Sequence, residues 1–169
     1  MASIMNTKVD PKPASRTRGS QAQSGPDTLL LDDQLCFALH STVLAMNKLY
    51  RKLLARLELT YPQYLVMMVL WERDGVSLSD IGKRLFLDSA TLTPLLKRME
   101  SAGLLKRVRA EDDERHIVIT LTPAGRALRA KATQVPTEVG CALACPVEEL
   151  AQLKQQLESL RDRMAGYVE

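Results

Sequence analysis

The feature that most constrains this chain is the succession of local patterns between residues 77 and 122. Ser77-x-x-Asp80 is typical of a helix start, and Gly103 is a good terminator for a second helix. Two extended stretches follow, residues 106–109 and 115–122, joined by an acidic loop, which indicates a β-hairpin. Two helices joined by a tight turn and followed by a hairpin form a winged helix-turn-helix. We therefore predict a mostly α-helical fold with one small β-hairpin.

Positive charge gathers on the same segment. The whole chain holds 23 Lys and Arg against 20 Asp and Glu, so it is only slightly basic. Residues 79–109 alone hold seven bases and three acids, a local net charge of +4. A solvated helix surface would produce the same excess. Its coincidence with the helix-turn-helix pattern favours an anionic partner, double-stranded DNA.

The second helix of the pair is predicted to enter a major groove, while the hairpin reaches the neighbouring minor groove or the backbone. Lys83, on the first helix, is predicted to contact phosphate only. In the hairpin loop, Asp113 is predicted to hold the Arg115 guanidinium outward for insertion into a narrow minor groove. The alternative is a solvated turn whose acids repel DNA. The predicted base or phosphate contacts on the second helix are Ser89, Thr91, Thr93, Lys97 and Arg98.

Apolar stripes flank the winged helix-turn-helix, which we assign to residues 59–122. In residues 27–58 apolar positions recur at steps of three and four, with Asp32 as the predicted N-cap of one long helix. In residues 123–169 the leucines from Leu150 onward follow a seven-residue repeat that favours a partner helix. We predict that both flanks form the helical dimerisation base of a homodimer, within a single domain of residues 27–169.

The composition of the chain also excludes several classes of protein. Residues 1–26 are rich in Ser, Pro, Gly and basic residues and are predicted to be a disordered basic tail. They lack the apolar block of a secretory signal, and no stretch is apolar for long enough to cross a bilayer. Three cysteines are too few, and odd in number, for a secreted disulfide framework. We expect a cytoplasmic protein with no membrane partner.

Three stretches make the chain similar to a known family. They are Leu35-Cys36-Phe37, the run Leu-Thr-Tyr-Pro-Gln-Tyr at 59–64, and residues 87–98 followed by Asp113-Glu114-Arg115. On these motifs the chain resembles the MarR superfamily over about residues 30–160, specifically its organic hydroperoxide resistance regulators. The resemblance implies a MarR-like dimer that acts as a transcriptional repressor rather than an enzyme. It implies no cofactor or metal, and an organic hydroperoxide as the effector.

The same resemblance implies roles for thiols and phenols. Cys36 corresponds to the sensing thiol that a hydroperoxide oxidises to a sulfenic acid. Tyr50 and Tyr61 match the tyrosines whose hydroxyls hydrogen-bond its thiolate. Tyr50 lies 14 residues beyond Cys36, about 21 Å along one helix, so the contact would come from the other subunit. In the two-cysteine branch of the family the sensing cysteine forms an intersubunit disulfide with a late cysteine, which Cys141 matches here.

Other interpretations of these residues stay open. Cys36 with His40, and Cys141 with Cys145, are both i, i+4 pairs that together could make a Cys3His zinc set. All three thiols could equally be inert core residues. A thiol peroxidase needs an α/β scaffold, which the pattern does not contain. A MarR-type regulator released by a small aromatic ligand is a further alternative, and the roles of Cys145, His40 and the tail are not assigned.

Overall fold

The computed structural model describes residues 29–109 and 117–168 of the chain. The predicted tail, residues 1–26, and the loop residues Asp113 and Arg115 lie outside the described residues. The chain divides into two compact units, residues 1–39 and 40–169, and each is described by itself. Among the described helices, none combines the length and the apolar character needed to cross a membrane.

The described part of the first unit is a short 3-10 helix, η1 (Leu31–Asp33), and the start of α1 (Leu35–Leu54). The prediction that Asp32 caps this helix is wrong. Asp32 lies inside η1, and Gln34, in an extended conformation, separates η1 from α1. The 3-10 turn uses backbone groups that a helix capped by Asp32 would need. In this turn the Asp33 N–H donates to the Leu30 carbonyl at 3.2 Å. Cys36 is therefore the second residue of α1.

In the second unit, α1 ends at Leu54 and a 3-10 turn, η2 (Ala55–Leu57), follows it. The apolar pattern that predicted one long helix continues to Leu57, so the helix ends about one turn earlier than the pattern. Helix α2 (Tyr61–Glu72) begins after Thr60. Its start is stabilised by a capping box, in which the Thr60 N–H donates to the Gln63 side chain at 2.8 Å.

The helix-turn-helix consists of α3 (Leu78–Leu85) and α4 (Ser89–Ser101). The predicted start at Ser77 is confirmed, since its hydroxyl accepts the Asp80 N–H at 3.0 Å. Asp88 caps α4 by accepting the Thr91 N–H at 2.6 Å. The predicted terminator Gly103 is also confirmed: it has φ +73°, and its N–H donates to the Glu100 carbonyl at 2.9 Å.

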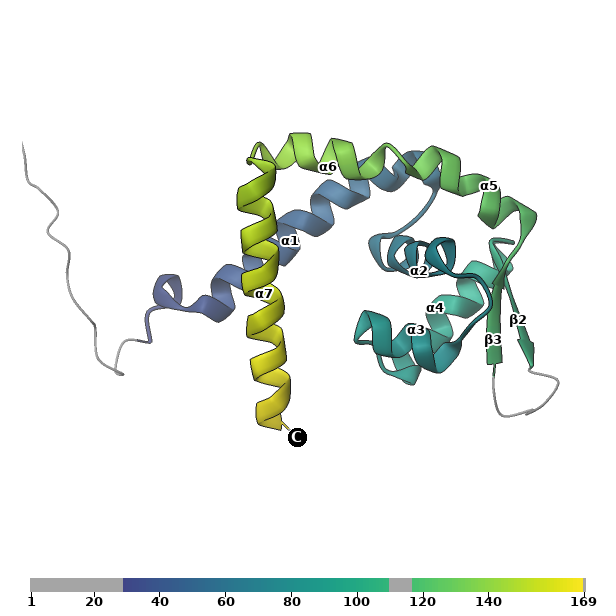
Figure 1. Cartoon of the computed structure of the whole chain (residues 1–169), viewed down its shortest axis with the longest axis horizontal. Helices are drawn as coiled ribbons and strands as arrows, with labels where there is room; N and C mark the ends of the chain where they lie inside the picture. The colour runs from purple at the N-terminus through teal and green to yellow at the C-terminus, as the bar shows by residue number, and fades with distance from the viewer. Residues whose placement is uncertain (1–28, 110–116, 169) are drawn as a thin grey trace, which may run out of the picture. The chain divides into compact units, whose positions relative to one another are not determined.

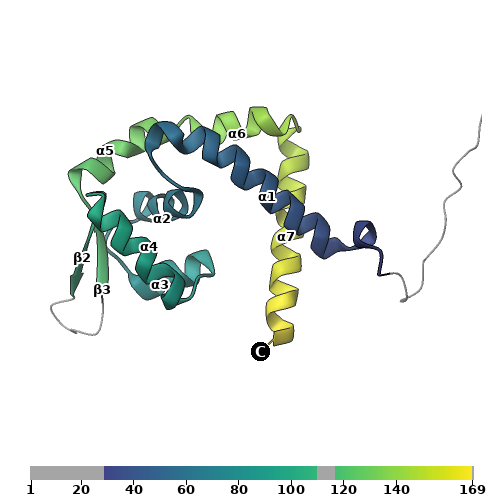
Figure 2. The ribbon, with the colours of Figure 1, turned by 180° about the vertical axis from the view of Figure 1, so that it is seen from behind.

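The hairpin is part of a three-stranded antiparallel sheet of β1 (Val76–Ser77), β2 (Leu105–Arg109) and β3 (Ile117–Leu121), in the order β1-β3-β2. The hairpin was predicted, but the two-residue strand β1 is too short to show an alternating pattern. Figure 1, and the reverse view in Figure 2, show α2, α3 and α4 gathered beside the β2–β3 hairpin. The core between them consists of fully buried side chains: Val66, Met67, Leu70, Ile81, Leu92, Leu96, Met99, Leu105 and Ile119.

Three helices complete the chain: α5 (Pro123–Ala132), α6 (Val135–Leu143) and α7 (Val147–Val168). The dipeptide Thr122-Pro123 predicts an N-cap followed by the first residue of a helix, and Thr122 caps α5, because its hydroxyl accepts the Gly125 N–H at 3.0 Å. Helix α5 packs on α2, where the Trp71 indole N–H donates to the Gly125 carbonyl at 2.9 Å. The leucine repeat falls on α7, where no described side chain is buried and Leu157 is 42% exposed.

Candidate functional site

Helix α4 presents the predicted DNA-contacting residues on its solvent side. Leu92, Leu95, Leu96 and Met99 turn inward and are buried. The polar residues predicted to contact DNA occupy the other positions of the helix, in line with its 3.6-residue period. Thr93 is partly buried, and four of the candidates are exposed: Ser89, Thr91, Lys97 and Arg98.

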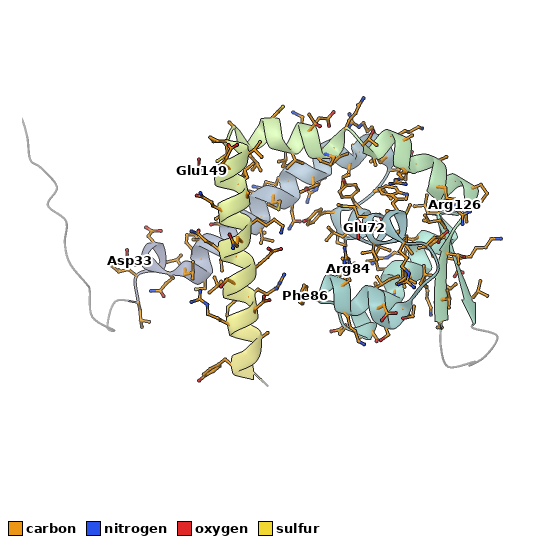
Figure 3. The ribbon with its side chains drawn as sticks, in the orientation of Figure 1. Asp33, Glu72, Arg84, Phe86, Arg126 and Glu149 are labelled. Atoms are coloured by element: carbon orange, nitrogen blue, oxygen red, sulfur yellow. The ribbon has the colours of Figure 1, made fainter. Side chains whose placement is uncertain are left out.

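The structure divides the bases of the winged helix-turn-helix into paired and unpaired groups. Arg84 pairs with Glu72 (Figure 3), and Arg107 pairs with Glu100 at 2.8 Å. Both arginines belong to the seven bases that give residues 79–109 their net charge of +4. Within residues 79–109, four exposed bases have no carboxylate partner among the residues that the structure describes: Lys83, Lys97, Arg98 and Lys106. These unpaired charges lie on α3, α4 and β2, which is a suitable arrangement for following a phosphate backbone.

The two tyrosines named from the sequence come together in the second unit. The rings of Tyr50 on α1 and Tyr61 on α2 are stacked, with 4.2 Å between their centroids. Tyr64, which the sequence motif at 59–64 includes without assigning it a role, has its ring centroid 6.0 Å from that of Tyr50. Burial raises the pKa of all three phenols. Their hydroxyls are therefore neutral at physiological pH and can donate hydrogen bonds to an anion.

The three cysteines have different surroundings. Cys36 is exposed in the first turn of α1, in the first unit, and Cys141 is exposed on α6 in the second. Helix α6 ends at Leu143, and Ala144 adopts a left-handed conformation with φ +48°. Cys145 therefore lies beyond the helix, and the expectation that it shares a helix face with Cys141 is wrong. Across residues 29–109 and 117–168, no three His, Cys, Asp or Glu side chains are grouped as metal ligands.

Cys145 is further distinguished by a carboxylate. A hydrogen bond with the Glu149 side chain, together with some desolvation, raises the pKa of the Cys145 thiol. Its thiolate fraction at neutral pH is correspondingly reduced, which lowers its reactivity as a nucleophile.

An ion pair connects the helix that carries Cys141 to the turn that follows α1. Arg56, in η2, donates two hydrogen bonds to the Glu138 carboxylate, at 2.7 and 2.8 Å. Glu138 is on α6, three residues before Cys141. Because the contact is bidentate, it favours one direction of approach between α6 and the turn that follows α1, although its exposure keeps its contribution to stability small.

A pocket of about 200 Å³ opens between α2 and α5, where the segment assigned to the winged helix-turn-helix meets the segment assigned to the dimerisation base. Its lining is mostly apolar, with Tyr64, Met68 and Trp71 on the α2 side. Arg129 on α5 also lines it and has no carboxylate partner among the described residues. No sequence pattern could indicate this pocket, because its walls are about 60 residues apart in the chain.

Comparison with known proteins gives matches over most of the described chain. The family model for the transcriptional regulator SarA/Rot matches residues 48–131. The HTH-type transcriptional regulator TtmR of Methylorubrum extorquens is 49% identical over 82% of this chain and 71% of the relative. The organic hydroperoxide resistance transcriptional regulator of Bacillus subtilis is 43% identical over 82% of this chain and 94% of the relative.

Among solved structures, the regulator AbfR of Staphylococcus epidermidis is similar in more than one state. Reduced AbfR bound to DNA is 35% identical with a TM-score of 0.72, covering 82% of this chain and 95% of that one. Disulfide-formed AbfR is 37% identical with a TM-score of 0.54, covering 77% and 91%. Similarity thus extends to a protein whose structure is known both on DNA and with a disulfide.

Proposed function

The chain belongs to the MarR-like winged-helix family of DNA-binding transcriptional regulators, and we propose that it is a peroxide-sensing repressor. It binds operator DNA as a reduced homodimer and is released when an organic hydroperoxide oxidises Cys36, which then forms an intersubunit disulfide with Cys141. The observation that carries this proposal is the stacked pair Tyr50 and Tyr61, which supplies two neutral hydroxyl donors side by side. The relative from Bacillus subtilis is named for organic hydroperoxide resistance, which agrees with it.

A homodimer is needed to complete the sensing site. Cys36 and Tyr50 are 14 residues apart on α1, and a helical rise of about 1.5 Å per residue excludes direct contact within one chain. In a twofold dimer, the tyrosines of one protomer can serve the thiol of its partner. The exposed stripe on α7, with Leu153 at 49% and Met164 at 51%, supplies apolar surface for such an assembly.

The proposed chemistry proceeds in two balanced steps. The Cys36 thiolate attacks the terminal oxygen of the hydroperoxide, the O–O bond breaks, and a sulfenic acid and an alcohol form after protonation of the leaving alkoxide. The Cys141 thiol then attacks the sulfenic sulfur, so that a disulfide forms and water leaves. The tyrosine hydroxyls stabilise the initial thiolate by hydrogen bonding.

Formation of a crosslink explains why release can be nearly complete. Adding one hydroxyl to sulfur changes about one hydrogen bond, roughly 1 kcal/mol. Changing a two-state equilibrium from one side to the other needs about 5 kcal/mol. The disulfide supplies this difference by displacing the helices that carry both thiols. The two α4 helices then no longer match successive major grooves, which are about 34 Å apart.

The proposed DNA contacts follow the sequence analysis. Ser89, Thr91, Thr93, Lys97 and Arg98 act from α4, and Lys83 contacts phosphate from α3. Asp113 and Arg115 lie outside the described residues, and their minor-groove role stays a prediction. Replacing Arg115 by Ala should weaken operator binding and leave the dimer intact in light scattering. Unchanged binding would remove Arg115 from the interface.

The experiment compares two matched cysteine variants. Purified protein is treated with cumene hydroperoxide, then analysed by non-reducing electrophoresis and by gel shift on its own promoter. Wild type and Cys145→Ser should give a crosslinked dimer band and lose DNA binding. Cys141→Ser should give no dimer band and remain largely bound. If Cys145→Ser abolishes the band instead, Cys145 is the resolving thiol; if treatment never releases DNA, the redox mechanism is wrong.

The pocket between α2 and α5 favours a second candidate function. Its apolar walls and the unpaired Arg129 suit a small aromatic carboxylate, because the one acid in the lining, Glu72, is paired with Arg84. A regulator of this kind would be released by a salicylate-like compound without any cysteine. Titrating the promoter complex with salicylate and with hydroperoxide side by side distinguishes the two, and Arg129→Ala should abolish only a response to salicylate.

A further inference from the structure

The carboxylate of Glu100, near the end of α4, binds β2 through two groups of one residue. Its Oε1 accepts the backbone N–H of Arg107 at 3.0 Å, and its Oε2 accepts the Arg107 side-chain Nε–H at 2.8 Å. Two charge-assisted hydrogen bonds define a direction as well as a distance. The contact therefore determines how the β2–β3 hairpin is oriented against α4.

The order of the strands explains why this N–H is available. The order β1-β3-β2 leaves β2 at the edge of the sheet. In an antiparallel edge strand, alternate N–H groups point away from the neighbouring strand. Arg107 lies opposite Ile119 of β3, but its N–H donates to Glu100. Glu100 therefore accepts a backbone N–H that the edge strand β2 does not pair with β3.

Apolar packing already joins α4 to β2, so the ion pair is not needed for that purpose. Met99 and Leu105 are 0% and 1% exposed, directly beside the pair. The side chains of Arg107 and Glu100 are 23% and 35% exposed. An ion pair at this depth adds little to stability. Its main effect is on the angle between the two elements, which apolar contacts leave less defined.

We infer that Glu100 is a positioning residue for DNA recognition, which holds the β2–β3 hairpin at a fixed angle to α4. Both elements can then meet neighbouring grooves of one operator at the same time. The inference rests on the DNA binding in the proposed function and requires no cysteine. It also implies that Glu100 keeps Arg107 away from the DNA phosphates. A phosphate contact by Arg107 would strengthen binding to DNA of any sequence.

A positioning role and a simple charge effect of Glu100 predict opposite changes in affinity for the operator when the carboxylate is removed. Glu100→Gln removes a negative charge near the DNA and releases Arg107, and both changes raise affinity for any duplex. Loss of the fixed angle lowers affinity for the operator alone. The informative quantity is therefore the ratio of affinities for the two kinds of DNA, a ratio that a purely structural or electrostatic role of Glu100 would not change.

The experiment measures this ratio by fluorescence anisotropy at about 0.15 M salt, with a promoter duplex and an unrelated duplex of equal length. Glu100→Gln should lower the ratio about tenfold, comparable to the loss of one specific contact. Glu72→Gln is the matched control, because it releases Arg84 from an ion pair on the same unit with the same change in charge. It should leave the ratio within about twofold of wild type.

Two outcomes would overturn the inference. If Glu100→Gln raises both affinities equally, the carboxylate acts only through its charge. If Glu100→Gln misfolds, Arg107→Gln decides, since it removes the ion pair with Glu100 while its loss of charge affects both duplexes alike. A normal ratio for Arg107→Gln refutes positioning. Failure of the redox proposal is recognised separately, by wild type that binds the promoter but is not released by hydroperoxide.

Discussion

Gly125 on α5 gives the sharpest quantitative test of the packing beside the winged helix-turn-helix. A Cβ added there would lie closer than 3.0 Å to the Leu104 carbonyl oxygen and 3.2 Å from Leu121 Cδ2. The oxygen cannot easily move away, because it accepts the Thr122 N–H at 3.1 Å. Gly125 is itself held by the hydrogen bond from Trp71 to its carbonyl, at 2.9 Å.

The size of the effect of Gly125→Ala is the difference between two terms. Alanine is favoured over glycine inside a helix by up to about 1 kcal/mol. Overpacking a rigid contact costs about 1 to 3 kcal/mol, and two constrained backbones place this site near the upper value. We therefore expect a net loss of about 2 kcal/mol, which for a chain of this length lowers the Tm by about 4 to 8 °C.

Urea unfolding followed by the fluorescence of Trp71, the single tryptophan of the chain, measures the loss directly. Gly140→Ala is the control, because a Cβ there meets nothing within 4 Å in the described structure. It should stabilise the protein by up to about 1 kcal/mol. All variants are compared at one protein concentration, because a dimer unfolds in a concentration-dependent way. If Gly125→Ala is as stable as Gly140→Ala, the inferred close approach is wrong.

Three further predictions concern DNA, acid stability and assembly. Lys97→Ala should weaken binding to all duplexes and reduce the slope of log K against log salt by about 0.9; an unchanged slope would show that Lys97 meets no phosphate. Partial burial pushes the pKa of Asp74 up, but hydrogen bonds from Arg126 and two backbone N–H groups outweigh it and hold the pKa below its usual range. Its stabilising effect is thus present at neutral pH and lost as pH falls below about 4. Asp74→Asn should therefore cost about 1 kcal/mol at pH 7 and less in acid, whereas an equal loss in thermal melts at both pH values would contradict this. Leu157→Ser should raise the dimer dissociation constant about a thousandfold in sedimentation, since the change occurs twice across a twofold axis, while Gln156→Ser should not; equal effects would place α7 outside the interface.

Local signals in the sequence predicted most of the elements around the DNA-binding surface. The helix start at Ser77, the terminator Gly103 and the cap Thr122 are all observed. Each depends on residues within a few positions of one another, so the information lies inside a short window. The predicted start of α1 was wrong because a short window also allowed a competing 3-10 turn, which includes Asp32.

The candidate sites were predicted less completely. Tyr50 and Tyr61 were named from a resemblance, but their stacking, and the approach of Tyr64, require α1 and α2 to pack together. The seven bases of residues 79–109 were counted correctly, yet their count did not reveal that Arg84 and Arg107 are paired with acids. These partners are 12 and 7 residues away, on other elements.

The amino-acid sequence alone determined the order of the helix-turn-helix and the hairpin, the position of the basic segment and the apolar stripes of the first and last helices. Those properties follow from side-chain spacing and capping, which act along the chain. Only the tertiary structure decided which charges are free and how the β2–β3 hairpin is oriented against α4. Such properties depend on groups that packing brings together, and a linear pattern carries no record of those distances.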